Sequence, residues 1–127
     1  MKQEAKFEKQ IAGIAGLYGS AYFKIPDTRM LNAKNRWKNR EAKRPFDGIL
    51  VTPHKNICIE VKYQYNQLEP HQKINEQIIN DINNKSFFVV RKRKLKNATL
   101  YSVEKNGKKV FENTEIERMI EWLIIGF

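Results

Sequence analysis

Hydrophobic residues recur along the chain at two spacings, and these spacings predict the order of its helices and strands. Residues 3–18 carry apolar side chains at helical spacing, namely Phe7, Ile11, Ile14, Ala15 and Tyr18. Residues 20–25 have the composition of a strand, which Pro26 ends. We therefore expect the chain to begin with an amphipathic helix and a short strand.

The middle of the chain predicts a hairpin and then a second helix. Strands are expected over residues 46–52 and 57–63, and the short turn TPHKN between them indicates antiparallel pairing. Pro70 suits the first turn of a helix, where its missing N–H has no partner to lose. The buried stripe of this helix is predicted to be Ile74, Ile78, Ile79 and Ile82.

The last third of the chain predicts three more strands and a helix. The segment SFFVVRKR is typical of a strand, and ATLYSVEKNGKKVFE forms a hairpin around the turn pair Asn106-Gly107. Thr114 and Glu117 have the spacing of a capping box that opens a C-terminal amphipathic helix. The order αβββαβββα predicts a single α/β domain over residues 1–127, with a central mixed β-sheet flanked by helices.

Two acidic residues and a lysine interrupt the predicted first hairpin. Asp47 stands where its first strand begins, and Glu60 and Lys62 lie within the apolar run ICIEVKY of its second strand. Residues two apart on a strand share a face, so Glu60 and Lys62 point the same way. Ile57, Ile59 and Val61 point to the opposite face, into the core. Pairing around the turn brings Asp47 back beside Glu60 or Lys62.

This grouping favours a metal site that acts on phosphate. Two close carboxylates raise each other's pKa, and a divalent cation removes that penalty. A lysine beside the cation would stabilise charge that develops on a phosphodiester. A salt bridge across a solvated sheet face is the alternative. The apolar residues around Glu60 and Lys62 argue against it, because ionisable groups in a covered strand are costly unless they have a function.

Asp47 followed by Glu60-Val61-Lys62 resembles the signature of the PD-(D/E)XK nuclease superfamily. Within it, the chain is similar to the RecU-type Holliday-junction resolvases and, more loosely, to the VRR-NUC nucleases, through Phe7-Glu8, AYFKIP, IEVKY and LEPHQ. The resemblance covers roughly residues 4–92 and implies a restriction-endonuclease-like αβββαβ core, which the C-terminal hairpin and helix extend. It also implies hydrolysis of DNA that depends on Mg²⁺ or Mn²⁺.

The resemblance assigns roles to five residues. Asp47 and Glu60 are the implied metal ligands, Lys62 is the implied catalytic lysine, and Gln72 belongs to the implied active site. Glu8 is the candidate for a further metal ligand, although Glu4 lies on the same helical face.

RecU-type resolvases carry a long stalk before the aspartate, whereas only 20 residues separate Pro26 from Asp47 here. A nuclease of flaps, single strands or DNA ends therefore stays open as the alternative. A DNA-binding module without catalytic activity is the alternative of another class.

The charge of the chain predicts a polyanionic partner. Twenty-four Lys and Arg stand against fourteen Asp and Glu, for a net charge of +10. The candidate DNA contacts are Arg36, Lys38, Arg40, Lys43, Arg44, Arg91 and Arg93. The alternative is a solvated surface, since lysines at a sheet edge also prevent aggregation.

Other features exclude several classes of protein. No apolar run is long enough to span a membrane, and the charged start does not resemble a signal peptide. One cysteine and two histidines argue against disulfides and a zinc site, so a cytoplasmic protein is expected. We also expect a homodimer, formed through Trp122, Ile125 and Phe127 near the C-terminus.

Overall fold

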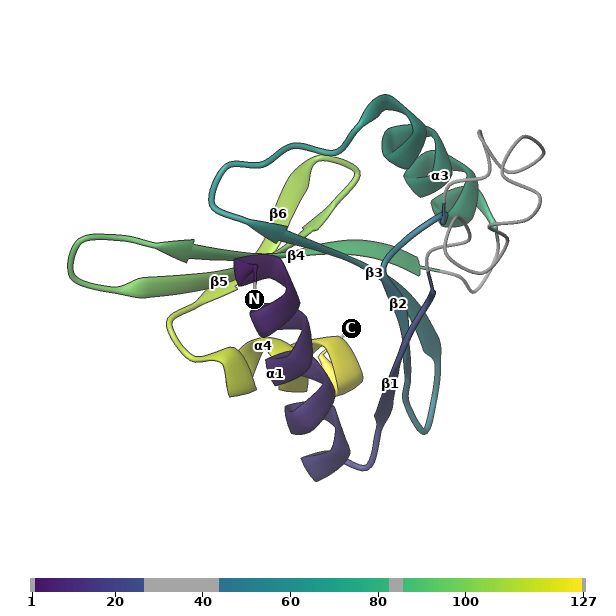
Figure 1. The fold of residues 1–127 in the computed structure, drawn as a ribbon. Coiled ribbons are helices and arrows are strands. Elements are labelled where there is room, and N and C mark those ends of the chain that lie inside the picture. The colour runs from purple at the N-terminus through teal and green to yellow at the C-terminus, as the bar shows by residue number, and fades with distance from the viewer. Residues whose placement is uncertain (1, 27–43, 83–85, 127) are drawn as a thin grey trace.

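A six-stranded sheet forms the centre of the molecule, with helices on both of its faces (Figure 1). The computed structural model describes residues 2–26, 44–82 and 86–126. Its elements are α1 (Gln3–Leu17), β1 (Ala21–Lys24), β2 (Gly48–Val51), β3 (Asn56–Tyr63), α3 (Pro70–Asp81), β4 (Ser86–Lys94), β5 (Thr99–Lys105), β6 (Lys108–Asn113) and α4 (Ile116–Ile125). The predicted element order and the α/β class with a mixed sheet are confirmed.

The six strands lie side by side in the order of the sequence. Neighbouring strands run antiparallel, except that β3 and β4 are parallel. A parallel pair needs a crossover connection, and α3 provides it. The predicted hairpin between β2 and β3 is confirmed, and its register pairs Gly48 with Ile59.

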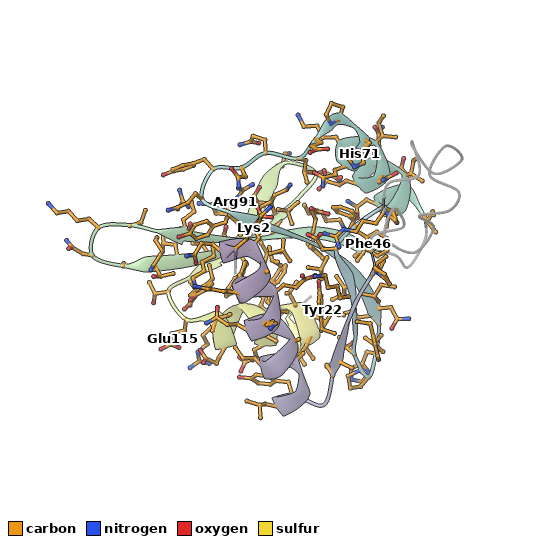
Figure 2. All side chains as sticks on the ribbon, viewed as in Figure 1. Lys2, Tyr22, Phe46, His71, Arg91 and Glu115 are labelled. Atoms are coloured by element: carbon orange, nitrogen blue, oxygen red, sulfur yellow. The ribbon has the colours of Figure 1, made fainter. Side chains whose placement is uncertain are left out.

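The larger hydrophobic core lies between the sheet and the helices α1 and α4, where side chains fill the space (Figure 2). Ile57, Ile59 and Val61 of β3 point into this core, as predicted, and each is almost fully buried. They meet Phe7 and Ile11 of α1. The alternate residues of β3 therefore face α3.

The predicted buried stripe of α3 was wrong for three of its four isoleucines. Ile74, Ile78 and Ile82 are 59%, 54% and 51% exposed, and only Ile79 packs against the small apolar cluster under this helix. The helix instead turns Gln72, Glu76 and Asn80 toward the sheet, where all three form hydrogen bonds. The cause is the sheet surface beneath, which carries charged side chains at Glu60, Lys62 and Arg91.

The C-terminal hairpin turns at Asn106 and Gly107, as predicted. Both residues have positive φ angles, 53° and 80°, which this turn requires and which glycine adopts without strain. The predicted capping box of Thr114 and Glu117 was wrong, because α4 has no side-chain cap. The side chain of Asn113 instead accepts a hydrogen bond from the main-chain N–H of Glu115 at 2.8 Å.

The aromatic ring of Trp122 is partly buried and packs against the larger core. It stacks on Phe111 and meets the edge of Phe88, with ring centroids 5.5 and 5.9 Å away. Of the other two residues predicted to form a dimer contact, Ile125 is 69% exposed and Phe127 lies outside the described residues. No helix within the described part of the chain is long and apolar enough to cross a bilayer.

Candidate active site

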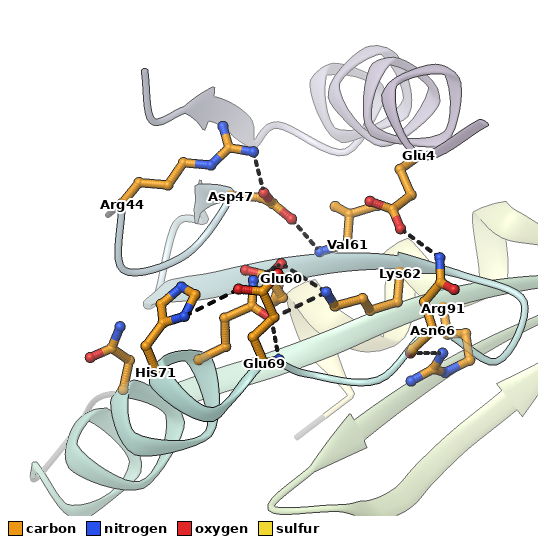
Figure 3. A network of polar contacts seen from close by, with 12 residues as sticks. Glu4, Arg44, Asp47, Glu60, Val61, Lys62, Asn66, Glu69, His71 and Arg91 are labelled. Carbon is orange, nitrogen blue, oxygen red and sulfur yellow. Dashed lines mark hydrogen bonds and ion pairs between the residues drawn. The ribbon is translucent and has the colours of Figure 1, made fainter. Parts of the chain in front are cut away.

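Asp47 is fixed by main-chain hydrogen bonds on both sides. Its N–H donates to the carbonyl of Ile59 at 3.0 Å, and its carbonyl accepts from the N–H of Ile25 at 2.9 Å. Its side chain then reaches β3, where Oδ2 accepts a hydrogen bond from the N–H of Val61 at 2.7 Å (Figure 3). Asp47 therefore lies beside the peptide bond between Glu60 and Val61, as the hairpin predicted.

Glu60 and Lys62 lie on one face of β3, under α3. They are 3% and 8% exposed, although both carry ionisable side chains. The Nζ atom of Lys62 lies 3.6 Å from Oε2 of Glu60, which makes a buried ion pair. β3 has neighbours on both sides, so these groups occupy a central strand.

Gln72 connects Glu60, Lys62 and the start of α3. Its Nε2 donates to Oε2 of Glu60 at 3.0 Å, and its Oε1 accepts from Nζ of Lys62 at 3.2 Å. The same Oε1 accepts the N–H of Glu69 at 2.8 Å and so forms half of a capping box at the helix start. One amide thus orients both ionisable side chains and is itself held by the helix that carries it.

The environment of Glu60 strongly favours its protonated form. Burial raises its pKa, and the neighbouring carboxylate of Asp47 raises it further. Lys62 and Arg44 act in the opposite direction, and the resulting pKa is about 8. Even with two nearby cations, Glu60 therefore keeps its proton near neutral pH.

Arg44 forms the closest ion pair of the site. Its Nη2 lies 2.7 Å from Oδ1 of Asp47, and its Nη1 donates to the carbonyl of Ile25 at 3.2 Å. Both carboxylate oxygens of Asp47 are thus engaged, one by Arg44 and one by Val61. The sequence predicts Arg44 as a DNA contact because it belongs to a basic segment, and nothing in that segment indicates its pairing with Asp47.

Glu8 lies on the inner face of α1 and contacts β1. Its Oε2 accepts a hydrogen bond from the hydroxyl of Tyr22, and its Oε1 lies 3.7 Å from Nζ of Lys24. Burial and then the Glu8 hydrogen bond raise the pKa of Tyr22. Glu4 points elsewhere and accepts from Asn66 at 3.2 Å, so Glu8 is the buried member of the pair.

Tyr22 was missed by sequence reasoning, because an aromatic residue in a strand has no distinctive spacing. Its ring passes directly over Gly48, where a Cβ atom would collide with it. The glycine after Asp47 therefore lets Tyr22 reach Glu8. The charges of Asp47 and Glu60 also raise the pKa of Tyr22, so this pair lies within electrostatic range of the site.

Two carboxylates, rather than three, form the candidate metal site. Among the residues that the structure describes, no group of three His, Cys, Asp or Glu side chains is placed to hold a metal ion. Glu8 is thus not gathered with Asp47 and Glu60 into a three-ligand set. Nδ1 of His71 lies 3.3 Å from Oε2 of Glu69 at the start of α3, so His71 pairs with a residue outside the Asp47 and Glu60 pair.

The predicted DNA contacts fall into two groups. Arg36, Lys38, Arg40 and Lys43 lie outside the described residues. Arg91 is buried and donates to Glu104 at 2.6 Å and to two main-chain carbonyls. Arg93 pairs with Glu112 at 3.2 Å and covers the ring of Tyr65. The guanidinium of Arg91 therefore connects β4 to β5 and to the loop after β3.

Comparisons with known proteins assign no family to the chain. No protein family model matches it, and no curated protein matches it significantly.

Proposed function

We propose that the chain is a metal-dependent DNA endonuclease of PD-(D/E)XK type. The observation that carries this proposal is the pair of adjacent buried carboxylates, Asp47 and Glu60, with the ammonium group of Lys62 3.6 Å from Glu60. Burying such groups in a central strand is costly unless they have a function. The element order α1, β1–β3, α3, β4 supports a restriction-endonuclease-like core, to which β5, β6 and α4 are added.

The donor atoms of the site fit Mg²⁺ or Mn²⁺. Both ions prefer oxygen ligands, and Mg²⁺ commonly binds through one or two carboxylates together with water and substrate phosphate. Asp47 and Glu60 would hold the ion. The raised pKa of Glu60 supports this assignment, because a cation at this place removes the repulsion between the two carboxylates.

The side chains around these carboxylates suit phosphodiester hydrolysis by water, without a covalent enzyme intermediate. When bound, the divalent cation polarises the phosphodiester and lowers the pKa of a water ligand. Lys62 places its positive charge beside the two carboxylates, where it stabilises charge that develops on the phosphate. Gln72 holds both Lys62 and Glu60 in place, so these groups need little reorganisation during the reaction.

Four-way junctions are the first substrate to test, because the chain resembles RecU-type resolvases. A junction is resolved by two symmetric cuts, so a homodimer with two sites is part of this form of the proposal. A second candidate function is a DNA-binding module without catalytic activity. The Arg44–Asp47 ion pair favours that candidate, since it neutralises Asp47 without a metal.

Cleavage assays separate these candidates. Supercoiled plasmid, linear duplex, single-stranded and four-way-junction DNA are each incubated with the protein in Mg²⁺, Mn²⁺ or EDTA. We expect cutting only with metal, and a loss of about 100-fold or more in Asp47→Asn and Lys62→Ala. Lys108→Ala, which alters an exposed lysine at the start of β6, serves as the control and should cut normally.

Binding of DNA without cutting in every metal would overturn the nuclease proposal and favour the module. Equal cutting of all four substrates would remove the preference for junctions. Normal cutting by Lys62→Ala would contradict the role given to this lysine.

A further inference from the structure

A cavity of about 550 Å³ lies beside the candidate active site, on the α3 side of the sheet. Val89 and Arg91 of β4 and Glu104 of β5 line it from the sheet. The helix α3, the loop before it and the turn at Asn106 form the remaining walls. Its volume lies within the range of about 300–1,000 Å³ that is typical of ligand pockets.

The register of the sheet places this cavity next to the catalytic candidates. Val89 pairs with Glu60, and Arg91 pairs with Lys62, across the parallel strands β3 and β4. Paired residues share a face, and neighbouring strands lie about 4.8 Å apart. On α3, Lys73 lines the cavity and directly follows Gln72. The floor of the cavity therefore lies beside the buried Glu60 and Lys62, on the same face of the sheet.

The charges of the cavity do not favour a phosphate group. Glu76, Asp81 and Glu104 line it together with two cations, Lys73 and Arg91. Of these cations, Arg91 is already bound to Glu104 and to main-chain carbonyls. The walls therefore carry no excess of positive charge that would attract a polyanion.

The remaining lining suits a flat, uncharged group with hydrogen-bonding edges. The amides of Gln67 and Gln77 offer both donors and acceptors, whereas both carboxylate oxygens of Glu104 already accept from Arg91. Leu68 adds partly buried apolar surface for the face of a ring, above the buried side chain of Val89. A nucleobase that has left its stack is recognised by hydrogen bonds to its edge and by packing of its faces against apolar or aromatic side chains, and the two amides and Leu68 offer contacts of both kinds.

We propose that this cavity receives an unpaired nucleobase next to the phosphodiester bond that is cut. The inference rests on the proposed nuclease function and narrows its substrate to DNA with an unpaired nucleotide at the cleavage site. A base within an intact duplex reaches such a pocket only after unpairing and unstacking, which costs a few kcal/mol. An unpaired base needs less of this free energy.

Binding in EDTA tests the cavity without any cleavage. The probes are two DNA duplexes of the same sequence, one with a 2-aminopurine that is fully paired and one with the 2-aminopurine as a single-base bulge. Anisotropy of a terminal dye gives the affinity, and 2-aminopurine fluorescence reports whether the base stays stacked. Gln77→Trp places a large side chain at the mouth of the cavity, whereas Gln3→Trp changes an exposed residue of α1 on the opposite side of the sheet.

We expect the wild-type protein to bind the bulged probe about tenfold more tightly than the paired probe. Gln77→Trp should abolish this preference and the accompanying change of fluorescence, and Gln3→Trp should keep both. Equal affinity for the two probes, or a preference that survives Gln77→Trp, overturns the cavity assignment.

The two proposals fail in different ways. A bulge preference without cutting in any metal retains the base pocket and removes the nuclease. Metal-dependent cutting without a bulge preference retains the nuclease and removes the base pocket. A protein that binds neither probe overturns the pocket, whatever the cleavage assay shows.

Discussion

The carboxylate of Asp47 accepts a hydrogen bond from the main-chain N–H of Val61, with 2.7 Å between Oδ2 and the nitrogen. Val61 lies between Glu60 and Lys62, so this bond ties one carboxylate to the strand that carries the other groups of the site. Its donor is a main-chain N–H, which no substitution of Val61 other than proline removes. The position of Asp47 relative to Glu60 is therefore part of the sheet itself.

The first prediction separates metal binding from the chemical step. We expect Asp47→Asn to weaken Mn²⁺ binding by about tenfold or more, because it removes one of two anionic ligands. Lys62→Ala should keep Mn²⁺ affinity within about threefold of wild type and still lose cleavage, because the lysine acts on phosphate. Isothermal titration calorimetry measures the first quantity, and loss of Mn²⁺ binding in Lys62→Ala would contradict the assignment.

A second prediction follows from the ion pair between Arg44 and Asp47. The guanidinium lies 2.7 Å from Oδ1 of Asp47, so a metal ion must compete with it for that oxygen. Arg44→Gln should therefore bind Mn²⁺ about tenfold more tightly than wild type, and Arg44→Lys should fall between the two. Titration calorimetry on the three proteins decides the matter, and weaker binding by Arg44→Gln would show that the arginine helps to hold the ion.

The third prediction concerns pH. The pKa of Glu60 is raised from its usual value of 4.5 to about 8 in the folded protein, mainly by burial. The folded state thus binds this proton more tightly than the unfolded chain, so the stability that the proton contributes is full below about pH 4.5 and is lost as the pH rises through about 8. Without metal, the wild-type protein should lose stability across that interval.

Glu60→Gln should reduce this loss, because it removes the titrating group. We expect its Tm at pH 9 to exceed that of wild type by about 5 °C in EDTA, and the two proteins to differ less at pH 5. Glu115→Gln, at an exposed residue before α4, is the matched control and should follow the wild-type curve. Parallel Tm curves for Glu60→Gln and wild type would rule out a raised pKa at Glu60.

The fourth prediction distinguishes the two roles of Gln72. Gln72→Ala should lower the free energy of unfolding by about 1 kcal/mol through loss of the capping box, and should slow cleavage by about tenfold through misplacement of Lys62 and Glu60. Glu69→Ala removes the other side chain of the same capping box but contacts neither Lys62 nor Glu60. Glu69→Ala should lose as much free energy of unfolding as Gln72→Ala and should still cleave DNA at the wild-type rate. Equal cleavage rates for the two variants would refute a positioning role for Gln72.

The fifth prediction tests which side of α3 faces the sheet. Ile78 is 54% exposed, so Ile78→Gln should change the free energy of unfolding by less than about 0.5 kcal/mol. Ile79 packs against the apolar cluster under the helix, and Ile79→Ala should cost about 2 kcal/mol. Urea denaturation of both variants measures the difference. A larger loss of unfolding free energy for Ile78→Gln than for Ile79→Ala would indicate that the Ile78 side of α3 faces the sheet.

Elements and strand pairing could be predicted because their signals are local. The turn TPHKN places β2 and β3 side by side, and the alternation along β3 then decides which residues share a face with Glu60. The position of Asp47 followed from the same register, since only 12 residues separate it from Glu60. Helical periodicity shows that α3 is amphipathic, but it does not tell which face turns inward when the sheet surface beneath carries charge.

Contacts that depend on the approach of distant side chains could not be predicted. Tyr22 reaches Glu8 only because Gly48 leaves room for its ring, and nothing in the spacing of these three residues reveals it. The pairing of Arg44 with Asp47 was hidden for another reason, since a basic segment suggests DNA contact for every member. Composition describes the segment as a whole, whereas the ion pair depends on where one side chain comes to lie.

The polar inner face of α3 has a consequence for how accurately the helix is placed. The hydrophobic effect has no preferred direction, whereas hydrogen bonds are directional and weaken steeply when bent. Gln72 binds Glu60, and Asn80 makes a two-way amide pair with the main chain of Phe87. A roll by one residue, about 100°, would break both at once. Asn80, two turns away from the carboxylates, thereby sets the rotational alignment with which Gln72 meets them.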